Sequence, residues 1–274
     1  MKIAVISDIH SNPRALRRVI NSARKKGCEK FICCGDLVGY GYAPNECIEI
    51  CKANDIECVK GNHDAALVGE LSLDWFNPTA ANGILANRPM VSEENKKWLA
   101  SLPYQITKAF AETKVVFSHG TFTLPERFDY IDDWYSARCE MNTMRANGID
   151  AMFVGHTHGP GEYNRRLSKD GPCGFREPPK DTKTPMGLIR REWSEAIFNV
   201  GSVGYPRRCR YSTYMILDDD TFFVECIRIP FDYTNYCDNL RSNGRVVPVW
   251  IEARTKFINN IVRKTKPLGM GGIA

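Results

Sequence analysis

Residues 2–20 read Lys-Ile-Ala-Val-Ile-Ser-Asp-Ile-His-Ser-Asn-Pro-Arg-Ala-Leu-Arg-Arg-Val-Ile. The apolar run over residues 2–6 is typical of a buried strand. Asn12 and Pro13 are the residue types preferred at a helix N-cap and at the first helical position. Apolar residues then recur at helical spacing as far as Ala23, and Gly27 is expected to end the helix. This stretch predicts a strand, a short polar loop and an amphipathic helix.

The same order of strand, polar motif and helix continues along the chain. Residues 31–34 and 56–60 predict two more strands, and a glycine followed by a polar residue ends each of them. The repetition indicates an α/β fold whose motifs lie at the C-terminal ends of strands, where open α/β sheets bind ligands. Residues 65–103 are expected to be helical. Later strands are expected at residues 115–117, 151–154, 196–200, 213–217 and 222–229.

All five histidines lie in short polar motifs at the ends of these apolar runs. The motifs are Ser7-Asp8-Ile9-His10, Gly35-Asp36, Gly61-Asn62-His63-Asp64, Ser118-His119-Gly120 and Gly155-His156-Thr157-His158. Neutral imidazole is the commonest metal ligand, and carboxylate and amide oxygens complete sites for hard or borderline cations. Any one of these motifs could be a turn, a helix cap or a core histidine. Their joint occurrence predicts a metal site with enough ligands for two cations.

Bulk properties narrow the class of protein. The 274 residues include 43% hydrophobic and 25% charged side chains, which is ordinary for one large domain with or without an appendage. The net charge of +5 suits an anionic substrate without requiring one. No basic run interleaved with aromatic residues indicates nucleic-acid binding. The eleven cysteines include no C-x-x-C pair, and no signal sequence or membrane-length apolar segment is seen, so we expect a cytoplasmic protein with reduced thiols.

The five motifs, taken together, resemble those of the calcineurin-like metallophosphoesterase superfamily. The resemblance covers about residues 1–230. Residues 35–49 (G-D-L-V-G-Y-G-Y-A-P-N-E-C-I-E) and 199–207 (N-V-G-S-V-G-Y-P-R) are most similar to its small prokaryotic phosphodiesterase-like or phosphatase-like branch. The resemblance implies a four-layer α/β/β/α sandwich of two mixed sheets. It also implies hydrolysis of a small phosphomonoester, phosphodiester or nucleotide by attack of a metal-bound hydroxide.

The resemblance further implies which residues hold the two metal ions. One ion would be bound by Asp8, His10, Asp36 and His158, and the other by Asp36, Asn62, His119 and His156. Asp36 would bridge the pair. Because imidazole supplies four of these ligands, Mn²⁺, Fe²⁺ or Zn²⁺ is favoured over Ca²⁺. His63 would donate a hydrogen bond or a proton to the leaving group, with Asp64 orienting it, although a purely structural role for His63 stays open.

The sequence departs from the phosphoprotein phosphatases of this superfamily. Residues 39–41, Gly-Tyr-Gly, replace a D-R-G segment whose arginine binds phosphate, and this disfavours a phosphoprotein substrate. Tyr40, Tyr42, Tyr205 and Arg207 lie on loops near the predicted site and are candidates to bind a base or a phosphate, with ordinary loop packing as the alternative. Two other functions remain: a non-catalytic scaffold for protein partners, and a metal-dependent nuclease.

Two regions fall outside the motif pattern. Residues 162–192 are rich in proline, glycine and charge, and they predict an insertion that begins at the rim of the site. We expect a loop that shapes substrate access, with Arg165, Arg166 and Arg176 as candidate contacts and a homo-oligomer contact as the alternative. Residues 231–274 predict a helical extension packed on the domain. Asp218-Asp219-Asp220 is expected to be a hairpin turn, with a cation site as the other interpretation.

Overall fold

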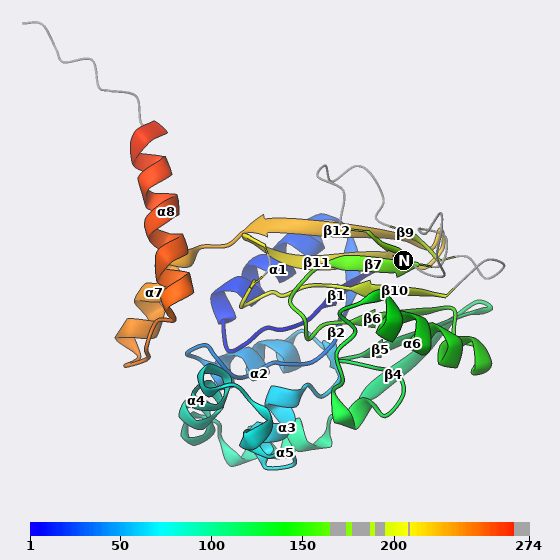
Figure 1. The fold of residues 1–274 in the computed structure, drawn as a ribbon, viewed down its shortest axis with the longest axis horizontal. Helices are drawn as coiled ribbons and strands as arrows, with labels where there is room; N and C mark the ends of the chain where they lie inside the picture. The colour runs from blue at the N-terminus through cyan, green and yellow to red at the C-terminus, as the bar shows by residue number, and fades with distance from the viewer. Residues whose placement is uncertain (165–173, 177–186, 190–194, 208, 266–274) are drawn as a thin grey trace, which may run out of the picture. The chain divides into compact units, whose positions relative to one another are not determined.

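The computed structural model describes residues 1–164, 174–176, 187–189, 195–207 and 209–265. The contacts divide the chain into two compact units, Met1–Phe231 and Asp232–Ala274. The first unit contains two six-stranded sheets (Figure 1). The second contains α7 (Tyr233–Ser242) and α8 (Val249–Thr265). The expectation of a helical C-terminal segment agrees with this description, whereas its packing on the domain stays a prediction.

The first sheet has the strand order β3-β2-β1-β11-β12-β9. Its strands are β1 (Lys2–Ile6), β2 (Cys28–Cys33), β3 (Glu57–Cys58), β9 (Gly187–Leu188), β11 (Tyr211–Asp218) and β12 (Phe223–Pro230). Strands β1, β2 and β3 are parallel, and β11, β12 and β9 pair antiparallel. The C-terminal ends of the parallel strands therefore lie at one edge of this sheet.

The second sheet has the order β4-β5-β6-β10-β7-β8. Its strands are β4 (Gln105–Phe110), β5 (Thr113–Ser118), β6 (Ala151–Val154), β7 (Gly161–Asn164), β8 (Gly174–Arg176) and β10 (Ala196–Asn199). Strands β5, β6 and β10 are parallel, and the other pairs are antiparallel. Both sheets are thus mixed, as predicted.

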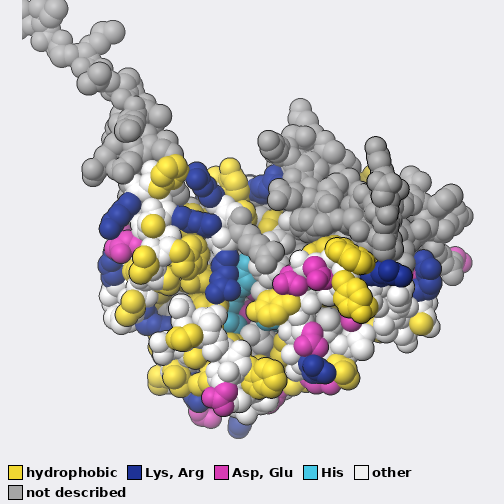
Figure 2. Space-filling model, in the orientation of Figure 1, with side chains coloured by type: hydrophobic (Ala, Val, Ile, Leu, Met, Phe, Trp, Pro, Cys, Tyr) yellow, Lys and Arg dark blue, Asp and Glu magenta, His cyan; other side chains and the backbone are white. Residues whose placement is uncertain are grey.

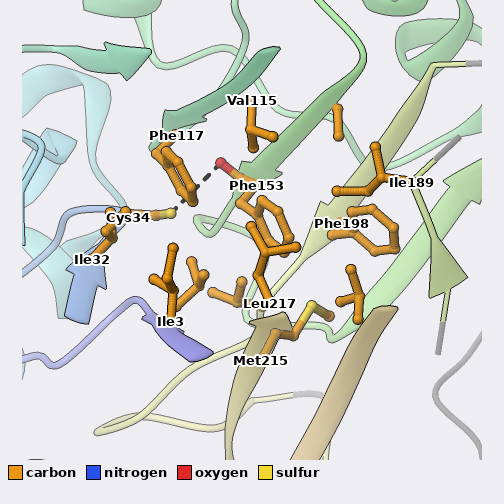
Figure 3. Packing of buried hydrophobic residues seen from close by; sticks show 14 of the residues in the cluster. Ile3, Ile32, Cys34, Val115, Phe117, Phe153, Ile189, Phe198, Met215 and Leu217 are labelled. Carbon is orange, nitrogen blue, oxygen red and sulfur yellow. Dashed lines mark hydrogen bonds between the residues drawn. The ribbon is translucent and has the colours of Figure 1, made fainter. Parts of the chain in front are cut away.

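The hydrophobic core lies between the two sheets. Phe117, Phe153 and Phe198 form a stack, with ring centroids 5.4 and 5.1 Å apart, and they face Ile3 and Leu217 of the other sheet (Figure 3). Each large side chain buried in this way contributes about 1.5–3 kcal/mol relative to an exposed one. Every second residue of the central strands belongs to this core, and their packing holds the two sheets face to face.

Helices cover the outer faces of both sheets. Residues of α1 (Pro13–Lys25) contact β2 and β11, and α2 (Pro44–Ala53) packs beside α1. On the other side, Met141 and Met144 of α6 (Trp134–Ala146) pack against Met152 and Ile197 of the second sheet. These four layers confirm the predicted α/β/β/α sandwich. Asn12 caps α1 as predicted, because its side chain accepts a hydrogen bond from the Ala15 N–H at 3.1 Å.

Residues 62–101 connect the two sheets and are helical, as expected. The segment contains α3 (Asn62–Val68), a 3₁₀ turn η1 (Leu73–Trp75), α4 (Pro78–Asn87), a second 3₁₀ turn η2 (Arg88–Met90) and α5 (Glu93–Ser101). A third 3₁₀ turn, η3, spans Pro125–Arg127. The third predicted strand, over residues 56–60, is shorter than expected. The Val59 N–H still donates to the Cys33 carbonyl of β2, but the Lys60 N–H donates to the Pro103 carbonyl instead.

Within the predicted insertion, residues 162–192, the described residues form short strands over residues 162–164, 174–176 and 187–188, and only these can be compared with the predicted rim loop. Strand β7 starts close to the Gly155–His158 motif and runs away from it, so that its last residue, Asn164, pairs with Ala196 at the start of β10. Strand β8 pairs antiparallel with β7, and Gly174 lies opposite Asn164. Strand β9 pairs with β12 in the other sheet. The described strands of the insertion therefore add outer strands to both sheets: β7 and β8 end the strand order of the second sheet, and β9 ends that of the first. Arg165, Arg166 and the Arg176 side chain lie outside the described residues, so their predicted contacts stay open.

Asp218, Asp219 and Asp220 lie at the hairpin turn between β11 and β12, as expected. The Asp218 Oδ1 atom accepts hydrogen bonds from the Asp220 and Thr221 N–H groups. The N-terminal ammonium of Met1 contacts Asp219 at 2.5 Å and Asp220 at 2.9 Å. Within the described residues, no helix is long and apolar enough to cross a membrane, and no cysteine forms a disulfide.

Candidate metal centre

The predicted ligands converge at the edge where the parallel strands of both sheets end. Asp8 and His10 follow β1, Asp36 follows β2, and His119 follows β5. His156 and His158 follow β6, and Asn62 begins α3. All six carboxylate and imidazole side chains are buried. In the space-filling view, histidine side chains are seen at the bottom of a narrow hollow with basic side chains beside it (Figure 2).

The backbone at these ligands is unusual. Asp8, His10, Asp36, His156 and His158 all have positive φ, between 46° and 67°. This left-handed conformation is uncommon for residues other than glycine and costs of order 1–3 kcal/mol where the residue does not favour it. Backbone hydrogen bonds fix it, since the Asp8 N–H donates to the Gly35 carbonyl and the His10 N–H to the Asp36 carbonyl, both at 3.0 Å. The polar side chains are thereby turned toward one another.

A first group of ligand atoms is formed by Asp8, His10 and His158. The Asp8 Oδ1 atom lies 3.1 Å from His158 Nε2 and 3.5 Å from His10 Nε2, and the two imidazole nitrogens are 3.2 Å apart. Asp36 Oδ2 lies 3.7 Å from His10 Nε2. These four residues are the predicted ligands of one ion.

A second group is formed around His119. Its Nε2 atom lies 3.0 Å from Asn62 Oδ1, 3.1 Å from His156 Nδ1 and 3.3 Å from Asp36 Oδ2. These are the four predicted ligands of the other ion. The same Asp36 oxygen, Oδ2, faces both groups, while Oδ1 accepts a hydrogen bond from the His63 N–H at 2.9 Å. Asp36 is therefore placed where a bridging ligand would be.

The hydrogen bonds of the imidazole rings favour cation binding. The Nδ1 atoms of His10, His119 and His158 lie 3.0, 2.7 and 2.6 Å from the backbone carbonyls of Val38, Cys34 and Tyr205. A carbonyl only accepts, so each Nδ1 carries a proton, and wherever Nε2 is unprotonated its lone pair faces the site. Metal-bound histidines typically make this second hydrogen bond. The facing Nε2 atoms of His10 and His158, 3.2 Å apart, lie beside the Asp8 Oδ1 atom, which has no hydrogen-bond partner among the described residues, and this arrangement fits a bound cation.

The charges of the site reinforce this fit. Burial alone would raise the pKa of Asp36, but His119 and His63 hold it below its ordinary value. Burial lowers the pKa of His119, yet the Asp36 carboxylate outweighs this and raises it to about 9. Burial and the charge of His119 together lower the pKa of His156 to about 3. The buried carboxylates therefore require positive charge, which His119 supplies as a proton and which a metal ion would supply instead.

His63 lies beside the two groups and lines the adjoining pocket. Its Nε2 atom is 3.9 Å from Asp36 Oδ2, and its buried Nδ1 atom has no hydrogen-bond partner among the described residues. Gly39 permits this position, because a Cβ there would lie 2.1 Å from the Nδ1 atom. His63, His10 and Asp36 are also close enough to hold an ion, so a ligand role is a second interpretation of His63.

The expectation that Asp64 orients His63 is wrong. Asp64 Oδ1 accepts hydrogen bonds from the N–H groups of Leu37 and Val38, and Oδ2 accepts one from Gly61. Burial and the charge of Asp36 raise the pKa of Asp64 to about 7. Its carboxyl group points toward backbone rather than toward the imidazole. Asp64 thus ties the Gly35-Asp36 loop to the start of α3, which is a structural role.

The predicted substrate-binding residues form one cluster. Tyr40 and Tyr205 stack with ring centroids 4.1 Å apart and an interplanar angle of 5°. The Arg207 guanidinium lies 5.4 Å from the Tyr40 centroid and donates to the Tyr40 hydroxyl at 3.2 Å. Tyr40 and Arg207 line the pocket, whereas Tyr205 is buried behind Tyr40 and holds His158 through its carbonyl. Tyr42 is not among the pocket-lining residues.

The pocket also contains residues that the sequence analysis did not propose. It has an empty volume of ≈ 340 Å³ and includes Asp36, Asn62, His63, His156 and His158 in its wall. Its other lining residues, besides Tyr40 and Arg207, are Trp75, Phe76, Asn77, Ala80 and Tyr130. Trp75 and Phe76 lie within residues 65–103, which were expected to be helical, and Tyr130 lies on an irregular loop that gave no periodic signal.

The comparison with known protein families decides the assignment. Residues 1–221 match the family model described as the calcineurin-like phosphoesterase superfamily domain. The chain belongs to the calcineurin-like phosphoesterase superfamily. This match confirms the family resemblance. The two groups of candidate metal ligands consist of residues from the motifs on which the resemblance was based.

Relatives of this chain share most of its length. An uncharacterized protein of Methanocaldococcus jannaschii is 36% identical over 263 residues, which cover 92% of this chain and 96% of that protein. The crystal structure of a metallophosphoesterase from Sphaerobacter thermophilus superposes with a TM-score of 0.74 at 29% identity, over 93% of this chain and 97% of that one. A hypothetical protein from Pyrococcus horikoshii has the same fold, with a TM-score of 0.68 at 17% identity over 91% and 95% of the two chains.

Asn87, a buried residue at the end of α4 (Pro78–Asn87), joins the loop after β1 to the loop after β2. The Asn87 Oδ1 atom accepts hydrogen bonds from the Ser11 hydroxyl at 2.6 Å and the Gly39 N–H at 2.7 Å. The Asn87 amide donates to the Gly41 carbonyl at 3.1 Å. Asn87 therefore anchors the loop that contains Tyr40 to the one that contains His10.

We expect the replacement Asn87→Ala to lower the free energy of unfolding by about 3 kcal/mol, because it leaves three buried polar groups without partners at about 1–3 kcal/mol each. Ser11→Ala is the matched control, since it removes only one of the three hydrogen bonds and should cost about 1 kcal/mol. Urea unfolding of both variants gives the comparison. If the two variants were equally stable, Asn87 would not be the anchor of these loops.

Proposed function

We propose that this chain is a dinuclear metal-dependent phosphoesterase that hydrolyses a small phosphomonoester, phosphodiester or nucleotide. The observation that carries the proposal is the pair of ligand groups that share Asp36 Oδ2. Each group brings together imidazole nitrogens and at least one carboxylate oxygen, which is the donor set of Mn²⁺, Fe²⁺ or Zn²⁺ sites. When bound, two such ions would lower the pKa of water toward about 7 and stabilise negative charge on a phosphoryl group.

The protein's own residues would position the ester. The pocket opens onto Asp36, Asn62, His156 and His158, so a phosphoryl group placed there would lie against the ligand groups. Arg207 lines the same pocket and carries the positive charge suited to a phosphate oxygen. Its guanidinium is held over the rings of Tyr40 and Tyr205. This contact restricts the side chain before substrate binds, so less conformational entropy is lost when Arg207 contacts a phosphate.

His63 would act at the leaving-group oxygen. Burial holds the pKa of His63 well below its ordinary value, so the ring is neutral at neutral pH. A neutral imidazole still donates one N–H hydrogen bond. Because His63 lines the pocket next to Asp36, its ring can donate to an oxygen on which negative charge develops. Hydrogen-bond donation is therefore favoured over complete proton transfer.

Metal analysis combined with a substrate panel tests this proposal. Protein purified without chelator is expected to contain two equivalents of Mn, Fe or Zn per chain by elemental analysis. It should hydrolyse p-nitrophenyl phosphate or bis(p-nitrophenyl) phosphate, lose that activity when chelator removes the metal, and regain it with Mn²⁺. Activity that persists in demonstrably metal-free protein would refute the metal dependence. Two bound metals without turnover of any ester would instead favour a scaffold.

A further inference from the structure

Three of the residues that line the pocket, Trp75, Phe76 and Tyr130, are aromatic. Trp75 lines the pocket although 82% of its surface is exposed, and none of the residues of its 3₁₀ turn, Leu73–Trp75, is buried. Large aromatic residues are usually well buried, whereas a tryptophan so exposed buries little apolar surface in the core. Its position at the pocket, beside Phe76, instead makes a flat apolar face available to a ligand.

The second aromatic group lies directly on a metal-ligand candidate. The Tyr130 ring stacks on the His156 ring with centroids 3.7 Å apart and an interplanar angle of 15°. Tyr130 is 52% exposed and lines the pocket. Phe76 meets the His63 ring edge-on, with centroids 5.2 Å apart and an interplanar angle of 82°. Three aromatic side chains from two separate loops thus surround the approach to the ligand groups.

Such walls do not suit the phosphoryl group itself, which needs hydrogen-bond donors and positive charge. They suit a planar ring, because stacking on aromatic side chains binds any nucleobase through its π face.

We propose that Trp75, Phe76 and Tyr130 form a nucleobase subsite, so that the preferred substrates are phosphoesters of nucleosides. The inference rests on the proposed function, because it assigns the substrate class of the same site. The base would stack against Trp75 at the mouth of the pocket, and the phosphoryl group would lie at the metal ligands. Arg207, which lines the same pocket, would contact a phosphate oxygen.

The test compares two ligands that differ only in the base. AMP and ribose 5-phosphate share the same sugar 5′-phosphate, so their inhibition constants against hydrolysis of a nitrophenyl ester isolate the contribution of the ring. Wild-type protein should bind AMP at least about 10-fold more tightly than ribose 5-phosphate, as expected for one stacked base. Trp75→Ala should weaken AMP by about 5- to 100-fold and leave ribose 5-phosphate nearly unchanged.

Trp134→Ala is the matched control, because Trp134 is 50% exposed but is not among the pocket-lining residues. It should alter neither inhibition constant. Equal binding of AMP and ribose 5-phosphate by the wild type would overturn the subsite, and so would an unchanged ratio in Trp75→Ala. Either result would leave the phosphoesterase proposal intact, since the nitrophenyl ester would still be hydrolysed.

A second readout separates the two proposals if no ester is hydrolysed. AMP added to the metal-loaded protein should quench tryptophan fluorescence, whereas ribose 5-phosphate should not. Trp75→Phe should lose that quenching while keeping an aromatic ring at the position. Quenching without turnover would retain the subsite and reject the hydrolytic function. Absence of quenching would reject the subsite independently of activity.

Discussion

Asp36→Asn is expected to remove metal binding and hydrolysis together. The substitution replaces the one oxygen that faces both ligand groups with a neutral amide, while the hydrogen bond from the His63 N–H can still be accepted. Loss of a residue that only supports a ligand costs about 10–100-fold in metal affinity, so loss of a charged bridging ligand should exceed this range. Elemental analysis after gel filtration should find at most one metal per chain, and ester hydrolysis should fall to background.

A matched control for this experiment is Asp220→Asn. Asp220 is an exposed carboxylate in the acidic hairpin turn, and its replacement removes the same charge far from the histidine motifs. That variant should keep two metals and full activity. Thermal unfolding of both variants in chelator would show whether the fold is preserved. If Asp36→Asn kept both metals and substantial turnover, the bridging role would have to be abandoned.

His63→Ala is expected to retain both metals and to lower turnover by about 10²–10⁴-fold, the range for one group that assists a leaving group. The loss should be larger for an alkyl ester than for a nitrophenyl ester, because nitrophenolate needs less help to depart. Steady-state kinetics with metal-saturated protein measures both effects.

A further variant distinguishes the possible roles of His63. His63→Gln keeps an N–H donor but cannot transfer a proton at neutral pH. Partial recovery of turnover in this variant would support hydrogen-bond donation, and no recovery over alanine would support proton transfer. Loss of metal from His63→Ala would show that His63 is itself a ligand, as its position beside His10 and Asp36 permits.

The positions of the motifs could be predicted from the sequence because each one follows a short apolar run. Strands that alternate with helices must place their C-terminal ends at a common edge, so Asp8, Asp36 and His119 were expected to lie together. The division of ligands between two ions came from the family resemblance, and spacing alone did not supply it. The same resemblance assigned Asp64 to His63, whereas Asp64 bonds to backbone N–H groups.

Other features have no local signal in the sequence. Left-handed backbone is uncommon even for Asp and His, which adopt it more often than most residue types, and at Asp8 and His10 it is fixed by hydrogen bonds to the Gly35–Asp36 segment. Strands β8 and β9 are two or three residues long and lie in a segment without periodicity. Trp75 and Tyr130 are far apart in the sequence and line the same pocket only in the folded chain, so the sequence did not indicate that they lie together.

Both ligand groups take their members from both sheets. Asp8, His10 and Asp36 follow strands of the first sheet, and His119, His156 and His158 follow strands of the second. Each ion would therefore link the two sheets of the sandwich at the edge where their parallel strands end. A ligand that binds only the folded state stabilises it by about 2.7 kcal/mol at a hundred times its dissociation constant. When metal is scarce, the folded sandwich would lose this stabilisation at the edge that carries the ligand groups, so that metal supply would affect the stability of the protein.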